Sequence, residues 1–203
     1  MIKTITETLI FVIILLFSVI LHEVAHGYAA LRNGDPTAKY MGRLTFNPIP
    51  HIDPIGTLLL PFLLVILKFP ILIGVAKPVP INPYYFRNYK VGMITVGLSG
   101  PISNILFGII LSLLYKFFSQ SVLGEFLLIA SFINFILAFF NLIPIPPLDG
   151  SRVITVLLPY NLRSFYERIE RYGIFIVLFL AMTGFLNWLS PLSRSLIEFF
   201  SNL

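Results

Sequence analysis

The stretch Ile20-Leu21-His22-Glu23-Val24-Ala25-His26-Gly27 lies within an otherwise apolar run that extends from Leu9 to Leu31. Its residues His22, Glu23 and His26 form the pattern H-E-x-x-H. Residues four apart lie on one face of a helix, so the two imidazoles could bind the same metal ion, with the carboxylate of Glu23 near the open coordination position. Ionisable side chains inside an apolar helix are costly, so the pattern indicates a functional metal site.

The composition of the whole chain is that of an integral membrane protein. Of its 203 residues, 57% are apolar and 11% are charged, and the mean hydropathy is +0.92. At about 20 residues per crossing, this length allows about four to six crossings, so we expect residues 1–203 to form a single membrane-embedded domain. The net charge of +5 is spread over connecting segments, which favours a role in topology over nucleic-acid binding.

The apolar segments predict an all-α polytopic membrane protein. Four full transmembrane helices are expected, at about Thr8 to Arg32, Val91 to Phe118, Val122 to Ile143 and Tyr172 to Leu189. The apolar segment Ile55–Val75 is interrupted by prolines and a lysine, which favours a re-entrant loop or a broken hairpin over a simple crossing. The stretch from Gly150 to Arg171 is expected to be amphipathic and to lie at the bilayer surface.

Two connecting segments have patterns of their own. Residues Thr37 to Asn47 partly alternate between apolar and polar side chains and are bracketed by prolines, which predicts a short surface strand or β-hairpin. Residues Ala76 to Pro83 contain three prolines, so this segment must be extended.

Two histidines rarely suffice for a zinc site, and a third protein ligand is expected. The chain has no cysteine, so the third ligand cannot be a thiolate. The candidates are His51, in a surface loop, and Asp149, beside a proline-broken helix end where its carboxylate could turn inward. The burial cost of an ionisable group favours Asp149, although an aspartate before Gly150 could instead cap the following helix.

If Asp149 and the two histidines bind the same metal ion, the topology of the chain is fixed. The ends of the first and third long helices would then share one side of the bilayer, and Ile55–Val75 would return to the side it left. In that arrangement most basic residues lie on the side of the metal: Arg32, Lys39, Arg43, Lys77, Arg87, Lys90, Arg152, Arg163, Arg168 and Arg171. The opposite side has Lys3, Lys116, Arg194 and, at the tip of the loop, Lys68. The positive-inside rule therefore predicts a metal site toward the cytoplasmic face.

Several motifs together resemble the site-2 protease family of intramembrane zinc metalloproteases. They are the H-E-x-x-H pattern in a membrane helix, Asn47-Pro-Ile-Pro-His-Ile-Asp-Pro54, Ala76-Lys-Pro-Val-Pro-Ile-Asn82, Gly100-Pro-Ile-Ser-Asn104 and Asn141-Leu-Ile-Pro-Ile-Pro-Pro-Leu-Asp-Gly150. The resemblance extends over about Leu21 to Ser151. The chain resembles a compact form of the family, without the PDZ or nucleotide-sensing domains of some members.

The resemblance implies roles for particular residues. One Zn²⁺ per chain would be bound by His22, His26 and Asp149, and Glu23 would be the catalytic base. Asn141 would assist in binding the substrate or the oxyanion, and Asn104 is a second candidate for that role. Hydrogen bonding between helices is the alternative explanation for both asparagines.

The function that this resemblance implies is hydrolysis of peptide bonds in or near transmembrane segments of membrane-protein substrates. We expect a multi-pass protein of the plasma membrane whose partners are its substrates and the lipid bilayer. Two alternatives remain, a membrane metal-ion transporter and a non-catalytic scaffold related to the protease. A transporter should have polar positions along a path rather than at one depth, and a scaffold should lack Glu23 or a ligand.

Overall fold

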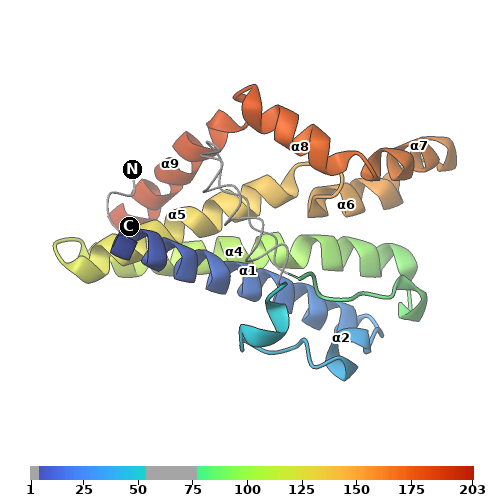
Figure 1. Cartoon of the computed structure of the whole chain (residues 1–203), viewed down its shortest axis with the longest axis horizontal. Helices are drawn as coiled ribbons and strands as arrows, with labels where there is room; N and C mark the ends of the chain where they lie inside the picture. Colours follow the sequence, from blue (N-terminus) through green and yellow to red (C-terminus); the bar gives the residue numbers. More distant parts are fainter. Residues whose placement is uncertain (1–4, 54–76) are drawn as a thin grey trace.

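The computed structural model describes residues 5–53 and 77–203, and all regular elements within these ranges are helices (Figure 1). In chain order they are α1 (Ile5–Arg32), α2 (Thr37–Tyr40), the 3₁₀ helices η1 (Ile49–His51) and η3 (Pro83–Tyr85), α4 (Tyr89–Phe118), α5 (Val122–Leu142), α6 (Asp149–Leu157), α7 (Tyr160–Glu170), α8 (Gly173–Met182), the 3₁₀ helix η4 (Phe185–Trp188) and α9 (Leu189–Asn202).

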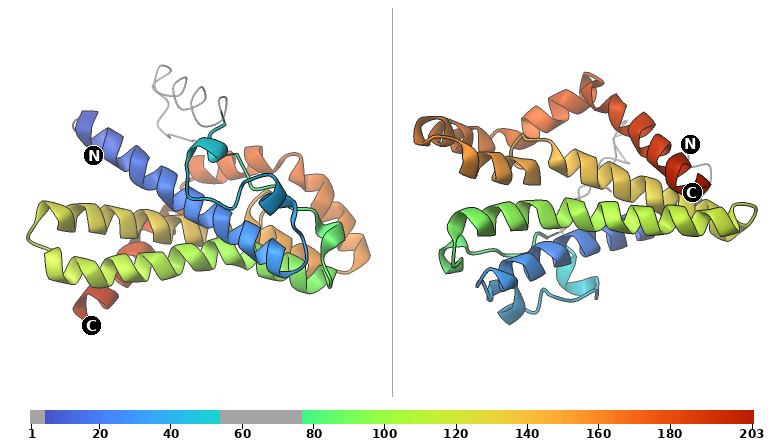
Figure 2. Two further views of the ribbon diagram at one scale, coloured as in Figure 1. Left: turned by 90° about the horizontal axis from the view of Figure 1, so that it is seen from below. Right: turned by 180° about the vertical axis from the view of Figure 1, so that it is seen from behind.

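Three helices are long and apolar enough to cross a membrane, and they form the body of the described structure. They cover Thr8–Arg32, Tyr89–Phe118 and Val122–Leu142. Helices α4 and α5 form an antiparallel hairpin, and α1 packs against both of them (Figures 1 and 2). The C-terminal ends of α1 and α5 and the N-terminal end of α4 lie at the same end of this bundle. The relative arrangement expected from the topology argument is therefore present.

Local sequence explains where the α4–α5 hairpin begins and turns. The side chain of Asn88 accepts a hydrogen bond from the backbone N–H of Val91, which caps the start of α4. Ser121 does the same for α5 by accepting from the N–H of Gly124. Each cap satisfies one of the backbone donors that a helix leaves unpaired at its first turn.

The predicted strand or hairpin over Thr37–Asn47 is wrong. Residues 37–40 form α2, and residues 41–47 contain turns and bends but no strand. Asp35 decides the local conformation, because its Oδ1 accepts hydrogen bonds from both the N–H and the hydroxyl of Thr37. Gly42 then reverses the chain with a positive φ of 64°, which glycine adopts without strain. The alternation of a few residues is a weak indication of a strand, and here the contacts of Asp35 and the turn at Gly42 determine the structure instead.

The last predicted crossing, Tyr172 to Leu189, is not one continuous helix. Helix α8 ends at Met182, Gly184 adopts a left-handed φ of 75°, and the chain continues through η4 into α9. The two helical parts are bent by 73° relative to each other. The described residues therefore contain three clear spans, or up to four if the bent pair counts as one. Burial of Leu189, Ser193 and Ile197 fixes α9 against α4 and α5.

The extended conformation predicted around Ala76–Pro83 is present over residues 77–82, which have no regular secondary structure. Arg43 fixes this segment by donating from Nη2 to the carbonyl oxygens of Lys77 and Pro78 at 2.6 and 3.3 Å. The N–H of Asn82 donates to Asp35 Oδ2 at 2.7 Å. The predicted re-entrant segment, residues 55–75, lies outside the described residues.

Candidate metal centre

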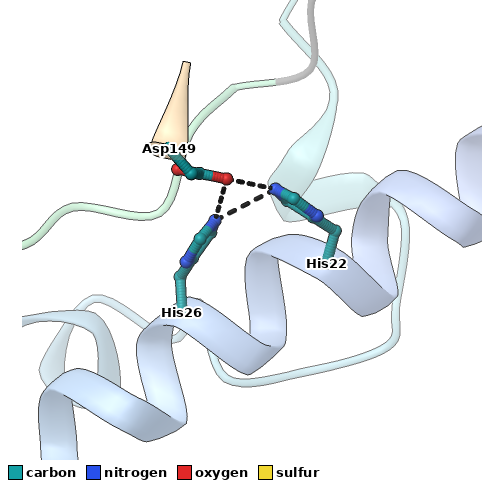
Figure 3. A group of neighbouring side chains, drawn as sticks. All are labelled: His22, His26 and Asp149. Atoms are coloured by element: carbon teal, nitrogen blue, oxygen red, sulfur yellow. Dashed lines mark hydrogen bonds and ion pairs between the residues drawn. The ribbon is translucent and has the colours of Figure 1, made fainter. Parts of the chain in front are cut away.

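The side chains of His22, His26 and Asp149 meet at the interface between α1 and the beginning of α6 (Figure 3). The Nε2 atoms of the two histidines lie 3.0 Å apart, and Asp149 Oδ2 lies 2.9 Å from the first and 3.0 Å from the second. All three residues are buried, with exposures of 6%, 4% and 6%. Among the described residues, no other group of three or more His, Cys, Asp or Glu side chains comes this close together.

Hydrogen bonds on the far side of each ring orient the two imidazoles. His22 Nδ1 lies 2.6 Å from the side-chain oxygen of Asn104, and His26 Nδ1 lies 2.7 Å from the backbone oxygen of Val96. A carbonyl oxygen can only accept, so Nδ1 must carry the proton in both rings. In a neutral imidazole the other nitrogen then presents a lone pair. Both Nε2 lone pairs are therefore available at the centre of the group.

The donor set fits a zinc ion. Two neutral imidazole nitrogens and one carboxylate oxygen are the protein ligands of many catalytic zinc sites, which leave a fourth position open. Ligands held about 2.0–2.2 Å from a tetrahedral ion lie roughly 3.3 Å from one another. The distances between the three atoms, 2.9 to 3.0 Å, are close to that spacing. A cation bound between these three electron-rich atoms would hold them together.

Gly100 allows α4 to approach the two imidazoles. A Cβ atom at this position would lie 2.5 Å from His26 Nε2 and 2.6 Å from His22 Cε1. Real Cβ atoms do not make such contacts, so any larger residue would displace the rings or the helix. The Gly100-Pro101 pair of the resemblance motif therefore has a direct spatial role beside the ligands.

Glu23 lies next to the ligands in sequence but is not one of them. Its Oε2 accepts a hydrogen bond of 2.7 Å from the backbone N–H of Val79, in the extended segment. The contact thus connects the second residue of the H-E-x-x-H pattern to residues 77–82, which line a larger cavity.

The other candidates from the sequence occupy different places. His51 is fully buried, and its Nε2 donates to the carbonyl oxygen of Thr45 at 2.9 Å, outside the ligand group. The alternative role of Asp149 as a helix cap is absent, because Leu148 occupies the cap position of α6 and no side chain bonds there. Asn141 is half-buried, and its amide donates to Leu137 O one turn back in α5.

Two buried polar residues were missed by the sequence analysis. Asn134, on α5, and Ser18, on α1, are 0% and 2% exposed and connect to Asn104. A weak signal existed, because Ser18 lies four residues before His22 and therefore on the same helical face. Nothing in the sequence pairs Asn134 with either residue, since that contact depends on how α5 packs.

A cavity of about 360 Å³ opens beside the site. One wall is the extended segment, including Val79 and Ile81, and the other is formed by α6 and α7, including Ser151 and Tyr166. The hydroxyl of Tyr166 donates to the carbonyl oxygen of Pro144, and burial raises the pKa of this phenol above its usual value. The cavity therefore reaches from the residue that contacts Glu23 to the residues that follow Asp149.

Comparison with known proteins identifies the relatives of this chain. Residues 118–184 match Peptidase family M50. The Bacillus subtilis protein named "Putative zinc metalloprotease YwhC" is 38% identical over 185 residues, which cover 85% of this chain and 81% of that protein. The chain belongs to peptidase family M50, the site-2 protease family. The M50 match contains Asp149 and Asn141, while the wider alignment with YwhC covers most of the chain.

Two further relatives extend well beyond the region that aligns with this chain. "Putative zinc metalloprotease Rip2" of Mycolicibacterium smegmatis is 28% identical, and the alignment covers 85% of this chain and 66% of Rip2. A protein of Methanocaldococcus jannaschii named as a zinc metalloprotease is 31% identical, with 72% of this chain and 33% of that protein covered. No solved structure matches the chain. The resemblance to an M50 metalloprotease is thus confirmed, and the ligand group of Figure 3 suits the zinc named for the relatives.

Proposed function

We propose that this protein is an intramembrane zinc metalloendopeptidase that hydrolyses peptide bonds in or near transmembrane segments of membrane-protein substrates. The observation that carries the proposal is the buried triangle of His22, His26 and Asp149, with Glu23 beside it. Two of these ligands lie on a helix that is long and apolar enough to cross a membrane. Membership of the M50 family and the metalloprotease names of the relatives support it.

The proposed chemistry divides between the ion and the side chains. When bound, zinc supplies a Lewis acid for the scissile carbonyl and lowers the pKa of a water from about 15.7 to about 7. Glu23 would accept the proton that the attacking water loses and would pass it to the leaving amine. The Val79 N–H holds Oε2 of Glu23, which orients the carboxylate before the reaction.

Asn141 remains the proposed contact for the substrate or the developing oxyanion. One hydrogen of its amide is donated to Leu137 O, which orients the group at the last turn of α5. The second hydrogen and the amide oxygen are available for a substrate. Such a donor near a developing negative charge is a recurring form of electrostatic catalysis.

A substrate helix hides its backbone carbonyls, so it must unwind before hydrolysis. With Thr37–Asn47 partly helical, the extended residues 77–82 are the segment along which an unwound substrate could add as a strand. This segment contacts Glu23 through Val79 and lines the cavity of about 360 Å³. The substrate would thus lie between the extended segment and helices α6 and α7.

The orientation in the bilayer is also part of the proposal. The ends of α1 and α5 and the start of α4 lie at one end of the bundle (Figure 1), and most basic residues of the sequence flank these ends. Asp149, the first residue of α6, follows the end of α5 closely in the chain. The positive-inside rule then directs the site toward the cytoplasm, in a plasma membrane. A metal-ion transporter is less well supported, because the buried polar residues deeper in the bundle are amides and hydroxyls with partners of their own.

The test compares three forms of the full chain, co-expressed with a membrane-anchored reporter and purified for zinc analysis. Glu23→Gln should keep about one zinc per chain and lose cleavage by about 10²- to 10⁴-fold, the usual contribution of a general base. His22→Ala should lose both zinc and cleavage. Equal cleavage by wild type and Glu23→Gln would remove the protease proposal, and zinc-independent cleavage would remove the metal from it.

A further inference from the structure

We propose that Asn134 and Ser18 are positioning residues that fix the tautomer of His22 through the amide of Asn104. This inference rests on the metal centre of the proposed function but concerns residues outside it. The three residues form one hydrogen-bonded chain from α5 through α1 and α4 to the imidazole. Their exposures are 0% for Asn134 and Asn104 and 2% for Ser18, so water cannot easily replace a missing partner.

The direction of the first bond is set by a backbone carbonyl. The hydroxyl of Ser18 donates to the carbonyl oxygen of Ile14 at 2.8 Å. A carbonyl oxygen accepts only, so the single hydroxyl hydrogen of Ser18 is used there. The lone pairs of Ser18 Oγ are left for another donor. That donor is Nδ2 of Asn134, at 2.9 Å.

The amide of Asn134 is fixed in the same way. Its Nδ2 donates one hydrogen to Ser18 Oγ and the other to the carbonyl oxygen of Ala130 at 2.8 Å. Both hydrogens are then used, and Oδ1 must face the remaining neighbour. That neighbour is Nδ2 of Asn104, at 2.7 Å. A flipped Asn134 amide would direct its oxygen at a carbonyl, which is repulsive in a buried site.

Asn104 passes this orientation to the ligand. Its Nδ2 donates to Asn134 Oδ1 and, at 3.2 Å, to the backbone carbonyl oxygen of Ser18. With both hydrogens used, Oδ1 faces His22 Nδ1 at 2.6 Å and requires a proton there. The lone pair of His22 is therefore kept on Nε2, which faces His26 and Asp149. Three backbone carbonyls, those of Ile14 and Ser18 on α1 and of Ala130 on α5, thus determine which nitrogen can bind a metal.

Helices α4 and α5 also contain a matched control for Asn134. Ser112 and Ser131 form a bond of 2.7 Å between α4 and α5, and both lie 2.9 Å from the carbonyl oxygen of Gly108. Both residues are 0% exposed, like Asn134. Their hydrogen bonds do not reach His22. Ser131→Ala therefore removes a buried polar contact between α4 and α5 without changing the hydrogen-bonded chain from Asn134 and Ser18 to His22.

The first measurement is the ring nitrogen spectrum of the zinc-free full chain in detergent, labelled with ¹⁵N-histidine and recorded at a pH high enough for the imidazoles to be neutral. The chain has three histidines, so His26→Ala and His51→Ala variants assign the remaining signals. In wild type and Ser131→Ala, His22 should be the Nδ1–H tautomer. In Asn134→Leu the amide of Asn104 keeps only its longer bond of 3.2 Å to the carbonyl oxygen of Ser18, so its orientation is held less strongly. The His22 signal should then shift toward a mixture of tautomers. An unchanged His22 tautomer in Asn134→Leu would overturn the proposal.

The second measurement is zinc affinity by competition with a chelator. Loss of a group that orients a metal ligand typically weakens binding 10- to 100-fold, and we expect about tenfold for Asn134→Leu. Ser18→Ala, a smaller change that serves if Asn134→Leu does not fold, should lose about three- to tenfold. An equal loss in Ser131→Ala would reveal general loosening and also overturn the proposal. Absence of zinc binding in wild type would refute the proposed function but leave the tautomer result valid.

Discussion

The two imidazoles of the ligand group lie one turn apart on α1, yet different parts of the molecule orient them. His22 depends on a side-chain oxygen, that of Asn104, whose own direction is fixed by further side chains. His26 depends on the backbone oxygen of Val96, which no substitution of that side chain removes. His26 is also nearer than His22 to the C-terminal end of α1 at Arg32.

This difference indicates at which residues outside the ligands a substitution could alter the metal site. Around His26, the protein uses a group that every residue supplies, so many sequences would support the same geometry. Around His22, a single change at a residue far from the metal could alter the tautomer. The two regions meet where the two Nε2 atoms lie 3.0 Å apart, at the shared carboxylate of Asp149, and at Gly100, whose missing Cβ leaves room for both rings.

The largest effect is expected where the two regions meet, in Gly100→Ala. The new Cβ would lie within 2.7 Å of atoms in both imidazoles, so both ligands must move together. Overpacking of this kind costs about 1–3 kcal/mol, and we expect zinc affinity to fall by up to about a hundredfold. Gly108→Ala is the control on α4, because its Cβ would meet only the ring of Phe135, at 3.1 Å. That control should lower thermal stability but keep zinc, and comparable zinc loss in both variants would contradict the role of Gly100.

A smaller effect, confined to the region around His22, is expected for Asn104→Leu. The substitution removes the acceptor for His22 Nδ1 at similar volume, so zinc affinity should fall about 10- to 30-fold, less than in Gly100→Ala. Val96→Ala, which shortens a buried side chain but keeps the acceptor of His26, should leave zinc affinity within about twofold. Chelator competition on both variants measures the contrast. If Val96→Ala loses zinc as strongly as Asn104→Leu, the distinction between the two regions is wrong.

The parts of the site that could be predicted from sequence are those that depend on local geometry. His22 and His26 need only the spacing of a helix, and the extended residues 77–82 need only their prolines. Asp149 required a topology argument and the family resemblance, because 123 residues separate it from His26. The strand expected at Thr37–Asn47 was wrong because the side chain of Asp35 binds the N–H and the hydroxyl of Thr37, where the short helix α2 begins.

Tertiary contacts explain the remaining differences. Polar residues in apolar helices, such as Asn104 and Asn134, indicate hydrogen bonds between helices, but the sequence does not pair them. Likewise, the bend after Met182 depends on a left-handed Gly184 and on the burial of α9 against α4 and α5. Each of these features follows from which helix faces which, and that information arises only when the bundle packs.

The smallest effect should come from a pair of serines, one in each region. Ser99 Oγ donates to Val96 O at 2.8 Å and lies 3.2 Å from His26 Nδ1, so it shares an acceptor that His26 keeps when the hydroxyl is lost. Ser99→Ala should therefore leave zinc affinity within about twofold, whereas Ser18→Ala should lower it about three- to tenfold, as expected for one net hydrogen bond. The same chelator competition compares the two variants, which remove the same atom from α4 and α1. A greater loss in Ser99→Ala than in Ser18→Ala would reverse the comparison, because it would make His26 the imidazole that relies on a neighbouring side chain.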